Sequence, residues 1–356
     1  MLFCTCSEQE QLSYPAMSHA ELLRIHHAKG WTGVEILNAW KKGTVSQHYI
    51  LVPRESELPK DLPKGTIIRT PLQRTILFSA VHGGLFCDLG CIDQTIGMCD
   101  TDYILHDSLR QRLTDHRLAD MGSSVQINQE RMVASRPDAL FVSPFENAGY
   151  GVLESLGIPL IECADYMETS ALGRAEWMKF YGLLMGREAE ADSLFASVEK
   201  DYLQLCEKVK QTKDRPSLLC DLKQGSAWYV PGGNSYIGRL FTDAGANYLF
   251  DHFEDNGSVA LSFEKVFAEA RDADIWIIKY GRSTPYTYST LAQDFPLNSD
   301  FSAWKNRRIY GCNTFGTAFY EEVPFHPNRL LQDMIRILHP DVLPEHQLNY
   351  YYPLSE

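Results

Sequence analysis

Cysteine is the residue type of this sequence with the widest chemistry, because its thiolate binds metals and acts as a nucleophile. The chain holds nine: Cys4, Cys6, Cys87, Cys91, Cys99, Cys163, Cys206, Cys220 and Cys312. The Cys87-x3-Cys91-x7-Cys99 group fits neither the CxxC spacing of zinc sites nor the runs that hold iron–sulfur clusters. We therefore interpret these cysteines as buried free thiols and assign no metal site.

Short catalytic motifs are also missing from the sequence. Residues 149–157 lack the G-x-G-x-x-G spacing of a dinucleotide loop, and residues 232–238 lack the Gly-Lys ending of a phosphate loop. Neither G-x-S-x-G nor H-E-x-x-H occurs. His326 and His339 flank the last predicted helix, too far apart to share a metal ion. The sequence favours a binding protein over an enzyme, although catalytic residues that meet only in the fold would leave no motif.

Length and charge narrow the class of protein further. At 356 residues and 44% hydrophobic content, the chain is long enough for two hydrophobic cores. The net charge of −13, with scattered cations, argues against nucleic-acid binding, which needs clustered Lys and Arg. No apolar run approaches the roughly 18 to 20 residues of a membrane-spanning helix. We expect a soluble body.

The first residues, MLFCTCSEQEQ, resemble the end of a bacterial lipoprotein signal, in which a Cys becomes the lipidated first residue. Cys6 would be that residue. Thr5 stands where a smaller residue is usual, and the apolar run is short. A lipid anchor at Cys6 and a plain N-terminal segment over residues 1–13 therefore both stay open at this point.

The elements that must position any site alternate between strands and helices. Three short β-branched runs at 31–37, 48–52 and 66–69 predict an N-terminal β embellishment. From Arg74 onward, strands and helices alternate, and the alternation resumes after residue 214. Such alternation predicts parallel sheets with right-handed crossovers. We predict an α/β fold with two Rossmann-like lobes, residues 14–186 and 214–356.

One long helical region separates these lobes. Apolar residues recur at intervals of three and four from Trp177 to Leu205, but Gly186 interrupts the region and Arg187-Glu188 opens a new turn. We therefore predict one helix over about 171–185 and a second within 187–213. The second would be a single rigid connection, roughly 39 Å long at 1.5 Å per residue, that allows only limited closure of the lobes.

Five stretches, in order, resemble the helical-backbone (class III) periplasmic substrate-binding proteins of ABC importers for ferric siderophores, haem and cobalamin. The resemblance covers about residues 70–340, and GREAEAD at 186–192 is similar to the family's entry into its interlobe helix. The stretches are TPLQRTILFSAVHGGLFCDLGCIDQTIGMCD, NQERMVASRPDALFVSP, GIPLIECADYMETSALGRAEWMKFYGLLMGREAEADSLF, GGNSYIGRLFTDAGANYLF and LSFEKVFAEARDADIWII.

The resemblance implies a monomeric extracytoplasmic receptor without a resident cofactor, which binds a metal chelate between its lobes. Open α/β sheets independently favour that place, because they bind ligands beyond the carboxyl ends of their strands. Candidate ligand-binding residues at these ends are Ser79, His82, Asp100, Tyr103, Ser143, Phe145, Glu146, Trp228, Tyr229, Tyr280, Arg282, Phe315 and Tyr320.

Each candidate also has a structural interpretation. Single aromatic residues are more often part of a core, Arg282 can pair locally, and His82 can be a satisfied histidine at a helix start. With one Arg and many aromatic residues, the candidate set favours cobalamin or a neutral ferric chelate over a triscatecholate, which needs several cations.

The family docks on the membrane subunits of its ABC importer through one acidic residue on each lobe. Glu264, in LSFEKVF, matches the second-lobe position, and Asp107 is the nearest acid in the first lobe. Such a receptor works in the periplasm or outside the membrane, which favours the lipid anchor at Cys6. The alternative from another class is a two-lobed metallocluster enzyme of nitrogenase-like architecture, with the internal cysteines as cluster ligands.

Overall fold

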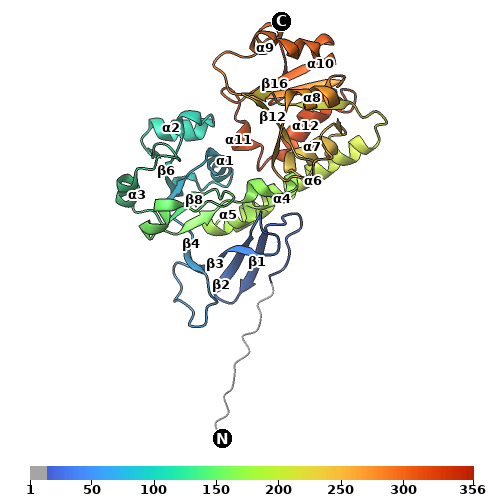
Figure 1. Cartoon of the computed structure of the whole chain (residues 1–356). Coiled ribbons are helices and arrows are strands. Elements are labelled where there is room, and N and C mark those ends of the chain that lie inside the picture. Colours follow the sequence, from blue (N-terminus) through green and yellow to red (C-terminus); the bar gives the residue numbers. More distant parts are fainter. Residues whose placement is uncertain (1–13) are drawn as a thin grey trace.

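Two α/β lobes, a small N-terminal sheet and a central group of helices make up the computed structural model, which describes residues 14–356 (Figure 1). The lipoprotein-like segment predicted at residues 1–13, with Cys6, lies outside the described residues. Among residues 14–356, no helix is long and apolar enough to cross a membrane.

The N-terminal sheet has four strands in the order β1-β2-β3-β4, of which only β3 and β4 are parallel. Tyr49 on β3 stacks on Phe180, with ring centroids 6.0 Å apart, and this contact fixes the sheet to the N-terminal lobe. The second to fourth strands confirm the prediction. The first was missed because His26 and His27 interrupt its apolar pattern. The bounds are β1 (Leu23–Ala28), β2 (Trp31–Leu37), β3 (Val45–Pro53) and β4 (Thr66–Thr70).

The N-terminal lobe is built on a fully parallel sheet, as predicted, and its strand order is β7-β6-β5-β8-β9. Its strands are β5 (Thr75–Leu77), β6 (Thr95–Met98), β7 (Ala119–Asp120), β8 (Ala139–Val142) and β9 (Leu160–Glu162). Its helices are α1 (Ala80–Asp88), η1 (Ile92–Gln94), η2 (Thr101–Tyr103), α2 (Asp107–Thr114), α3 (Gln129–Ser135), η3 (Gly151–Leu156) and η4 (Asp165–Met167).

The C-terminal lobe has a second sheet in the order β13-β10-β15-β16-β17, in which only β17 is antiparallel. A separate antiparallel sheet, β11-β12-β14, was not predicted as a sheet. The strands are β10 (Ser217–Cys220), β11 (Lys223–Gln224), β12 (Ala227–Pro231), β13 (Asn247–Tyr248), β14 (Ser258–Leu261), β15 (Ile275–Tyr280), β16 (Ile309–Asn313) and β17 (Tyr352–Pro353). The helices are α7 (Tyr236–Asp243), α8 (Phe263–Ala270), α9 (Tyr288–Asp294), η5 (Pro296–Asp300), α10 (Ser302–Lys305), α11 (Phe319–Glu322) and α12 (Pro327–Leu338).

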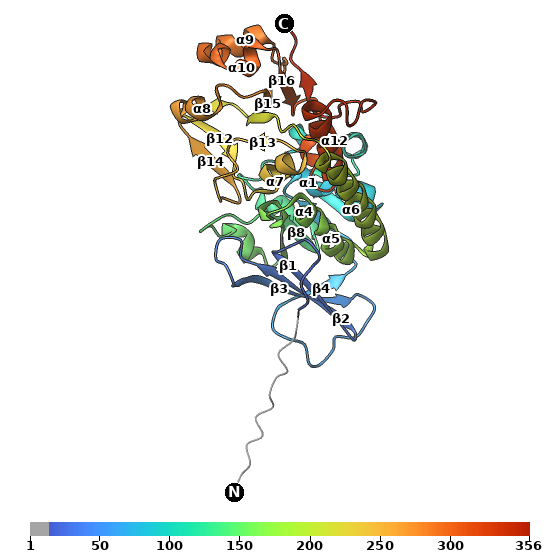
Figure 2. The same ribbon diagram turned by 90° about the vertical axis from the view of Figure 1, so that its right-hand side faces the viewer.

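The central helices are α4 (Ala171–Glu176), α5 (Met178–Met185) and α6 (Glu188–Lys210). Gly186 ends α5 with a φ of 68°, so the predicted break between the two long segments is present. The first predicted helix is itself interrupted at Trp177. The 23 residues of α6 span about 34 Å, and α6 packs against α5 and α12, so it reaches both lobes (Figure 2).

The two lobes also touch directly, beside this connection. The Glu321 carboxylate on α11 accepts hydrogen bonds from the backbone N–H groups of Leu105 (3.0 Å) and His106 (3.1 Å). His326 Nε2 lies 2.7 Å from Asp88 Oδ2. A Cβ at Gly84 on α1 would lie 2.3 Å from the Glu321 carbonyl oxygen, so only glycine allows this approach of α1 and α11. These contacts hold one side of the cleft closed.

Candidate functional site

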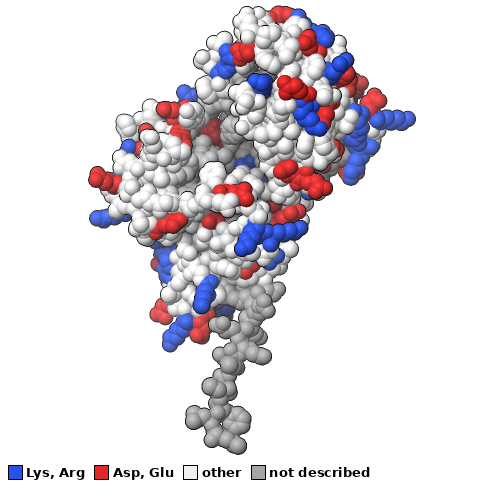
Figure 3. All heavy atoms as spheres, viewed as in Figure 1, with Lys and Arg blue, Asp and Glu red and all other residues white. Residues whose placement is uncertain are grey.

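A cavity of about 260 Å³ lies between the two lobes. The N-terminal lobe contributes residues that follow β5 and β6, and the C-terminal lobe contributes residues that follow β16, as expected of parallel sheets. Figure 3 shows the hollow between the lobes, whose visible walls carry few charged side chains. The lining residues are Phe78, Ser79, Ala80, Val81, Asp100, Tyr103, Leu105, Thr314, Thr317, Tyr320 and Glu321.

Local backbone structure fixes the polar groups of the N-terminal wall. Ser79 is the N-cap of α1, and its hydroxyl accepts a hydrogen bond from the Val81 N–H at 3.3 Å. Asp100 has a left-handed backbone with a φ of 52°, and its Oδ1 accepts from the Ser124 N–H at 3.1 Å. Both side chains are therefore held where two strands end at the cavity.

Aromatic side chains form the rim of the cavity. Tyr103, which is 67% exposed, comes from the N-terminal lobe, and Phe315 faces it from the C-terminal lobe with ring centroids 6.4 Å apart. Tyr320, 52% exposed, lines the C-terminal wall. Exposed aromatic groups on both sides of a cavity suit a ligand with broad apolar surfaces and polar edges.

The structure thus brings together four predicted residues, Ser79, Asp100, Tyr103 and Tyr320, with Phe315 beside them. His82 does not join them. Although it follows the same strand, the first turn of α1 directs it into the core, where it is 3% exposed and its Nε2 lies 3.2 Å from Asp165 Oδ1. In this structure His82 therefore lies in the core, with Nε2 beside Asp165 and Nδ1 without a hydrogen-bond partner among the described residues.

Three candidates of the C-terminal lobe also have structural partners outside the cavity. Trp228 is fully buried, and its indole N–H donates to the Cys220 carbonyl at 2.9 Å. Arg282 donates to Asp294 Oδ2 at 2.6 Å and lies over the Tyr286 ring. Tyr280 lines a separate hollow, and its hydroxyl accepts from the Tyr286 N–H at 3.1 Å.

The remaining predicted contacts lie outside the cavity lining. Phe145 and Glu146 are exposed in the turn after β8, where Phe145 bridges to Ala148, and Ser143 precedes this turn. Tyr229 is 45% exposed on β12. The loop after β8 therefore does not reach the cavity in this structure, although the strand order places it beside the loop after β5.

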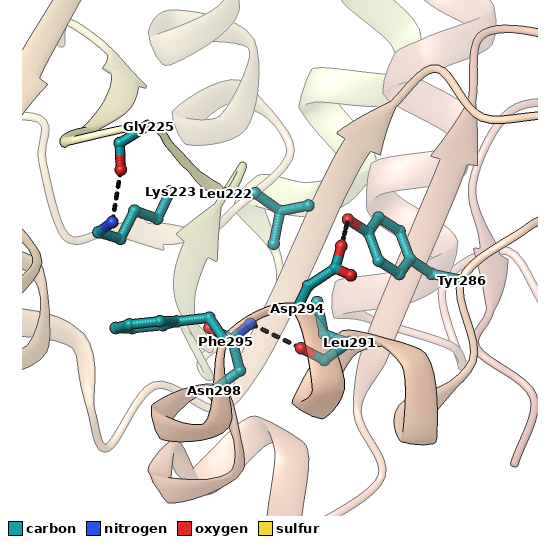
Figure 4. Close-up of a pocket in the computed structure, with 8 residues that line it drawn as sticks. All are labelled: Leu222, Lys223, Gly225, Tyr286, Leu291, Asp294, Phe295 and Asn298. Atoms are coloured by element: carbon teal, nitrogen blue, oxygen red, sulfur yellow. Dashed lines mark hydrogen bonds between the residues drawn. The ribbon is translucent and has the colours of Figure 1, made fainter.

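A smaller cavity of about 170 Å³ lies within the C-terminal lobe (Figure 4). Its charged groups already have partners, since Asp294 pairs with Arg282 and Lys223 donates to the Gly225 carbonyl. Asn298 donates to the Leu291 carbonyl at 3.0 Å. The interlobe cavity, open and lined from both lobes, is the better candidate for the main site.

The cysteines within residues 14–356 do not form a cluster site. Cys87, Cys91 and Cys163 pack in or against the N-terminal core, whereas Cys220 and Cys312 lie in the C-terminal core. Burial raises the pKa of Cys87 and of Cys91 to about 12, which keeps both as thiols at neutral pH. Over residues 14–356, no three His, Cys, Asp or Glu side chains are placed to hold one metal ion.

Comparison with known proteins agrees with the two-lobed geometry. Residues 100–314, more than half of the chain, match the family described as periplasmic binding proteins. The chain belongs to the periplasmic binding protein family. The members of this family bind solutes and are not enzymes, so the prediction of a non-enzymatic protein is confirmed and the metallocluster enzyme is wrong.

Relatives of this periplasmic binding protein are consistent with that assignment. An uncharacterized lipoprotein of Methanocaldococcus jannaschii is 26% identical over 296 residues, which cover 80% of this chain and 69% of the relative. Two solved structures show the fold. The Fe3+-hydroxamate transport protein of Saccharomonospora viridis (18% identity, TM-score 0.60) and the periplasmic heme-binding protein of Pseudomonas aeruginosa (19%, 0.60) each cover 76% of this chain and are covered to 94%.

The two predicted docking acids of this periplasmic binding protein lie on its surface. Glu264 is exposed in the first turn of α8, where hydrogen bonds from its own backbone N–H and from Ser262 lower its pKa. Asp107 is exposed at the first position of α2. Neither carboxylate makes an ion pair within 4.0 Å with another residue of the part that the structure describes.

Some residues in or near the interlobe cavity were not predicted from the sequence. Thr314 and Thr317 add hydroxyls to the C-terminal wall. Lys279, near the end of β15, has its Nζ 5.8 Å from the centroid of the Tyr320 ring, and Tyr236 at the start of α7 is another neighbour of this lysine. A polar residue that closes an apolar parallel strand, as Lys279 closes IWII, was the available indication for the lysine.

Proposed function

We propose that this protein is an extracytoplasmic receptor that captures a metal chelate between its lobes and delivers it to an ABC importer. The observation that supports it most is the aromatic rim, in which Tyr103 and Phe315 face each other across the cleft from opposite lobes. Ferric siderophores, haem and cobalamin all present broad surfaces with polar edges, to which such a rim is suited.

Two structural neighbours, an Fe3+-hydroxamate transport protein and a heme-binding protein, support the same ligand class. Neither neighbour decides between the chelates, because likeness at this level of identity concerns the fold.

A calorimetric titration tests this function. The purified protein is titrated with a ferric trishydroxamate, a ferric triscatecholate, haemin and cyanocobalamin, and at least one is expected to bind at micromolar concentration or below. The same chelates with their metal removed serve as controls where the free compound is stable. A protein that binds none of the four is not a chelate receptor.

The proposed location is outside the cytoplasmic membrane, with a lipid anchor at Cys6. Relatives that carry the name lipoprotein support this location. Intact-mass analysis of the protein expressed with a complete upstream signal would show the added mass of a lipid on Cys6. An unmodified Cys6 in that protein would remove the anchor from the proposal.

A further inference from the structure

Lys279 lies at a strand end of the C-terminal lobe, behind the wall of the interlobe cavity. It is the penultimate residue of β15, at the carboxyl end of a central parallel strand. The side chain is partly exposed, and its Nζ lies 5.3 Å from the ring centroid of Phe319 and 5.8 Å from that of Tyr320. Because Tyr320 lines the interlobe cavity, the ammonium group of Lys279 is separated from that cavity by the Tyr320 side chain.

The ammonium group of Lys279 makes no ion pair with the residues that the structure describes. No carboxylate of the described residues lies within 4.0 Å of its Nζ, whereas Arg174 and Arg282 each have an aspartate partner. Burial disfavours the charged form of Lys279, but Asp221, together with smaller effects of neighbours such as Tyr320, more than offsets burial, so the pKa of Lys279 is raised. Lys279 therefore carries a positive charge at neutral pH without a direct counterion.

The N-terminus of α7 and the guanidinium of Arg174 add positive charge near Lys279. Tyr236, whose hydroxyl also helps to raise the pKa of Lys279, is the first residue of α7. The N-terminus of a helix carries positive partial charge. The guanidinium of Arg174, from α4, lies 4.7 Å from the centroid of the Tyr236 ring while it pairs with Asp165. Two cations thus flank one phenol where α4 meets the C-terminal lobe.

Two acidic residues, Asp100 and Glu321, line the cavity itself. Asp100 stands on the N-terminal wall. Glu321 is buried, its carboxylate is occupied by the Leu105 and His106 N–H groups, and burial raises its pKa. The C-terminal side therefore holds the acids Glu321 and Asp221 as well as the ammonium group of Lys279, but among the described residues no carboxylate lies within 4.0 Å of that ammonium group.

We propose that the ligand carries a negatively charged group and that Lys279, with the hydroxyls of Tyr236 and Tyr320, binds this group. This inference rests on the proposed function and narrows it to anionic metal chelates, in contrast to the neutral chelate or cobalamin favoured by the sequence. An anionic edge of the chelate would face the C-terminal lobe, while its apolar surface meets the aromatic rim.

The test compares Lys279→Met with a control, Lys200→Met, which removes an exposed lysine from the surface of α6. Each variant is titrated with an anionic ferric triscatecholate, a neutral ferric trishydroxamate and molybdate as a bare oxoanion. The wild type is expected to prefer the triscatecholate. Lys279→Met should weaken that binding by about tenfold or more, Lys200→Met should not change it, and Lys279→Arg should restore most of it.

The titrations test the anion site at Lys279 and the chelate-receptor function separately. If the wild type binds chelates but prefers the neutral one, or if Lys279→Met binds the triscatecholate as wild type does, the anion site is wrong and the receptor function stands. If no chelate binds while molybdate binds through Lys279, the anion site stands and the chelate class is wrong. Binding of neither overturns both. Unchanged circular dichroism and melting temperature verify that the Lys279 variants fold.

Discussion

At the scale of single residues, two exposed tyrosines of the C-terminal lobe provide a matched comparison. Tyr320 lines the interlobe cavity, and Tyr229 is similarly exposed but lies outside it. Truncation of Tyr320 to alanine removes a ring from the proposed contact surface, so Tyr320→Ala should weaken chelate binding by about tenfold, or roughly 1.4 kcal/mol. Tyr229→Ala should leave it unchanged. Equal effects of the two variants in a titration would contradict this assignment of the site.

A buried ion network beneath the cleft supplies a prediction about pH. Burial opposes the charge of Asp165, but Arg174 and His82 more than offset it and hold its pKa below the ordinary value near ~3.9. The Asp165 charge therefore stabilises the fold above that value, and this contribution is lost as the pH falls through the lower pKa of the folded state.

Asp165→Asn should lower the free energy of unfolding at pH 7 by about 3 to 5 kcal/mol, because it leaves Arg174 buried without its partner. The difference from wild type should shrink below about pH 4, because the aspartate of the unfolded wild-type chain takes up a proton there while the folded one stays charged to lower pH. Urea unfolding of both proteins at several pH values measures this difference in the free energy of unfolding. A difference that grows on acidification would contradict the proposed ionisation.

The sequence predicted part of the site and missed part for physical reasons. Ser79, Asp100 and Tyr103 follow strand ends directly, so sheet topology alone placed them at the cavity. His82 follows a strand too, but the helical turn that starts at Ser79 rotates it inward. Which side of a turn a residue faces depends on packing that no local pattern records.

At the scale of elements, the break between α5 and α6 depends on one glycine. Gly186 has a φ of 68°, and a Cβ there would lie 2.9 Å from Pro71 Cβ. Gly186→Ala therefore adds both backbone strain and a close contact, and should cost about 1 to 3 kcal/mol of stability. Gly43→Ala is the control, because its φ is 80° but no atom lies within 4 Å. Chemical unfolding of both variants should show the larger loss at Gly186.

The prediction of elements succeeded where apolar periodicity was strong. The parallel strands β5, β6, β8, β9, β10, β15 and β16 and the two helical segments around Gly186 are present as expected, whereas the two-residue strands β7 and β13 were not predicted. Short antiparallel strands such as β11 and β14 were missed, because four residues or fewer give too little pattern and their pairing is decided by distant partners.

At the scale of the whole molecule, the two exposed acids give a prediction about transport. If Glu264 docks on the importer, Glu264→Ala should reduce chelate uptake in a reconstituted system severalfold without a change in chelate affinity. Asp192→Ala, which removes an exposed acid from α6, is the control. Uptake that is reduced equally by both variants would point to a general effect of surface charge and contradict docking through Glu264.

We expect the contacts between the two lobes to limit how far the lobes close on a ligand. We expect the α6 connection, the contact of α1 with α11 and the Glu321 hydrogen bonds to hold the lobes near one position. A receptor held in this way closes little on its ligand, and its affinity comes from groups already in place.

The most direct test of this account is a crystal structure of the protein grown with the tightest-binding chelate. The account predicts the chelate in the interlobe cavity, in contact with Tyr103 and Tyr320, with the α1–α11 contact intact. A chelate bound elsewhere, or lobes that separate at α1 and α11 on binding, would contradict it.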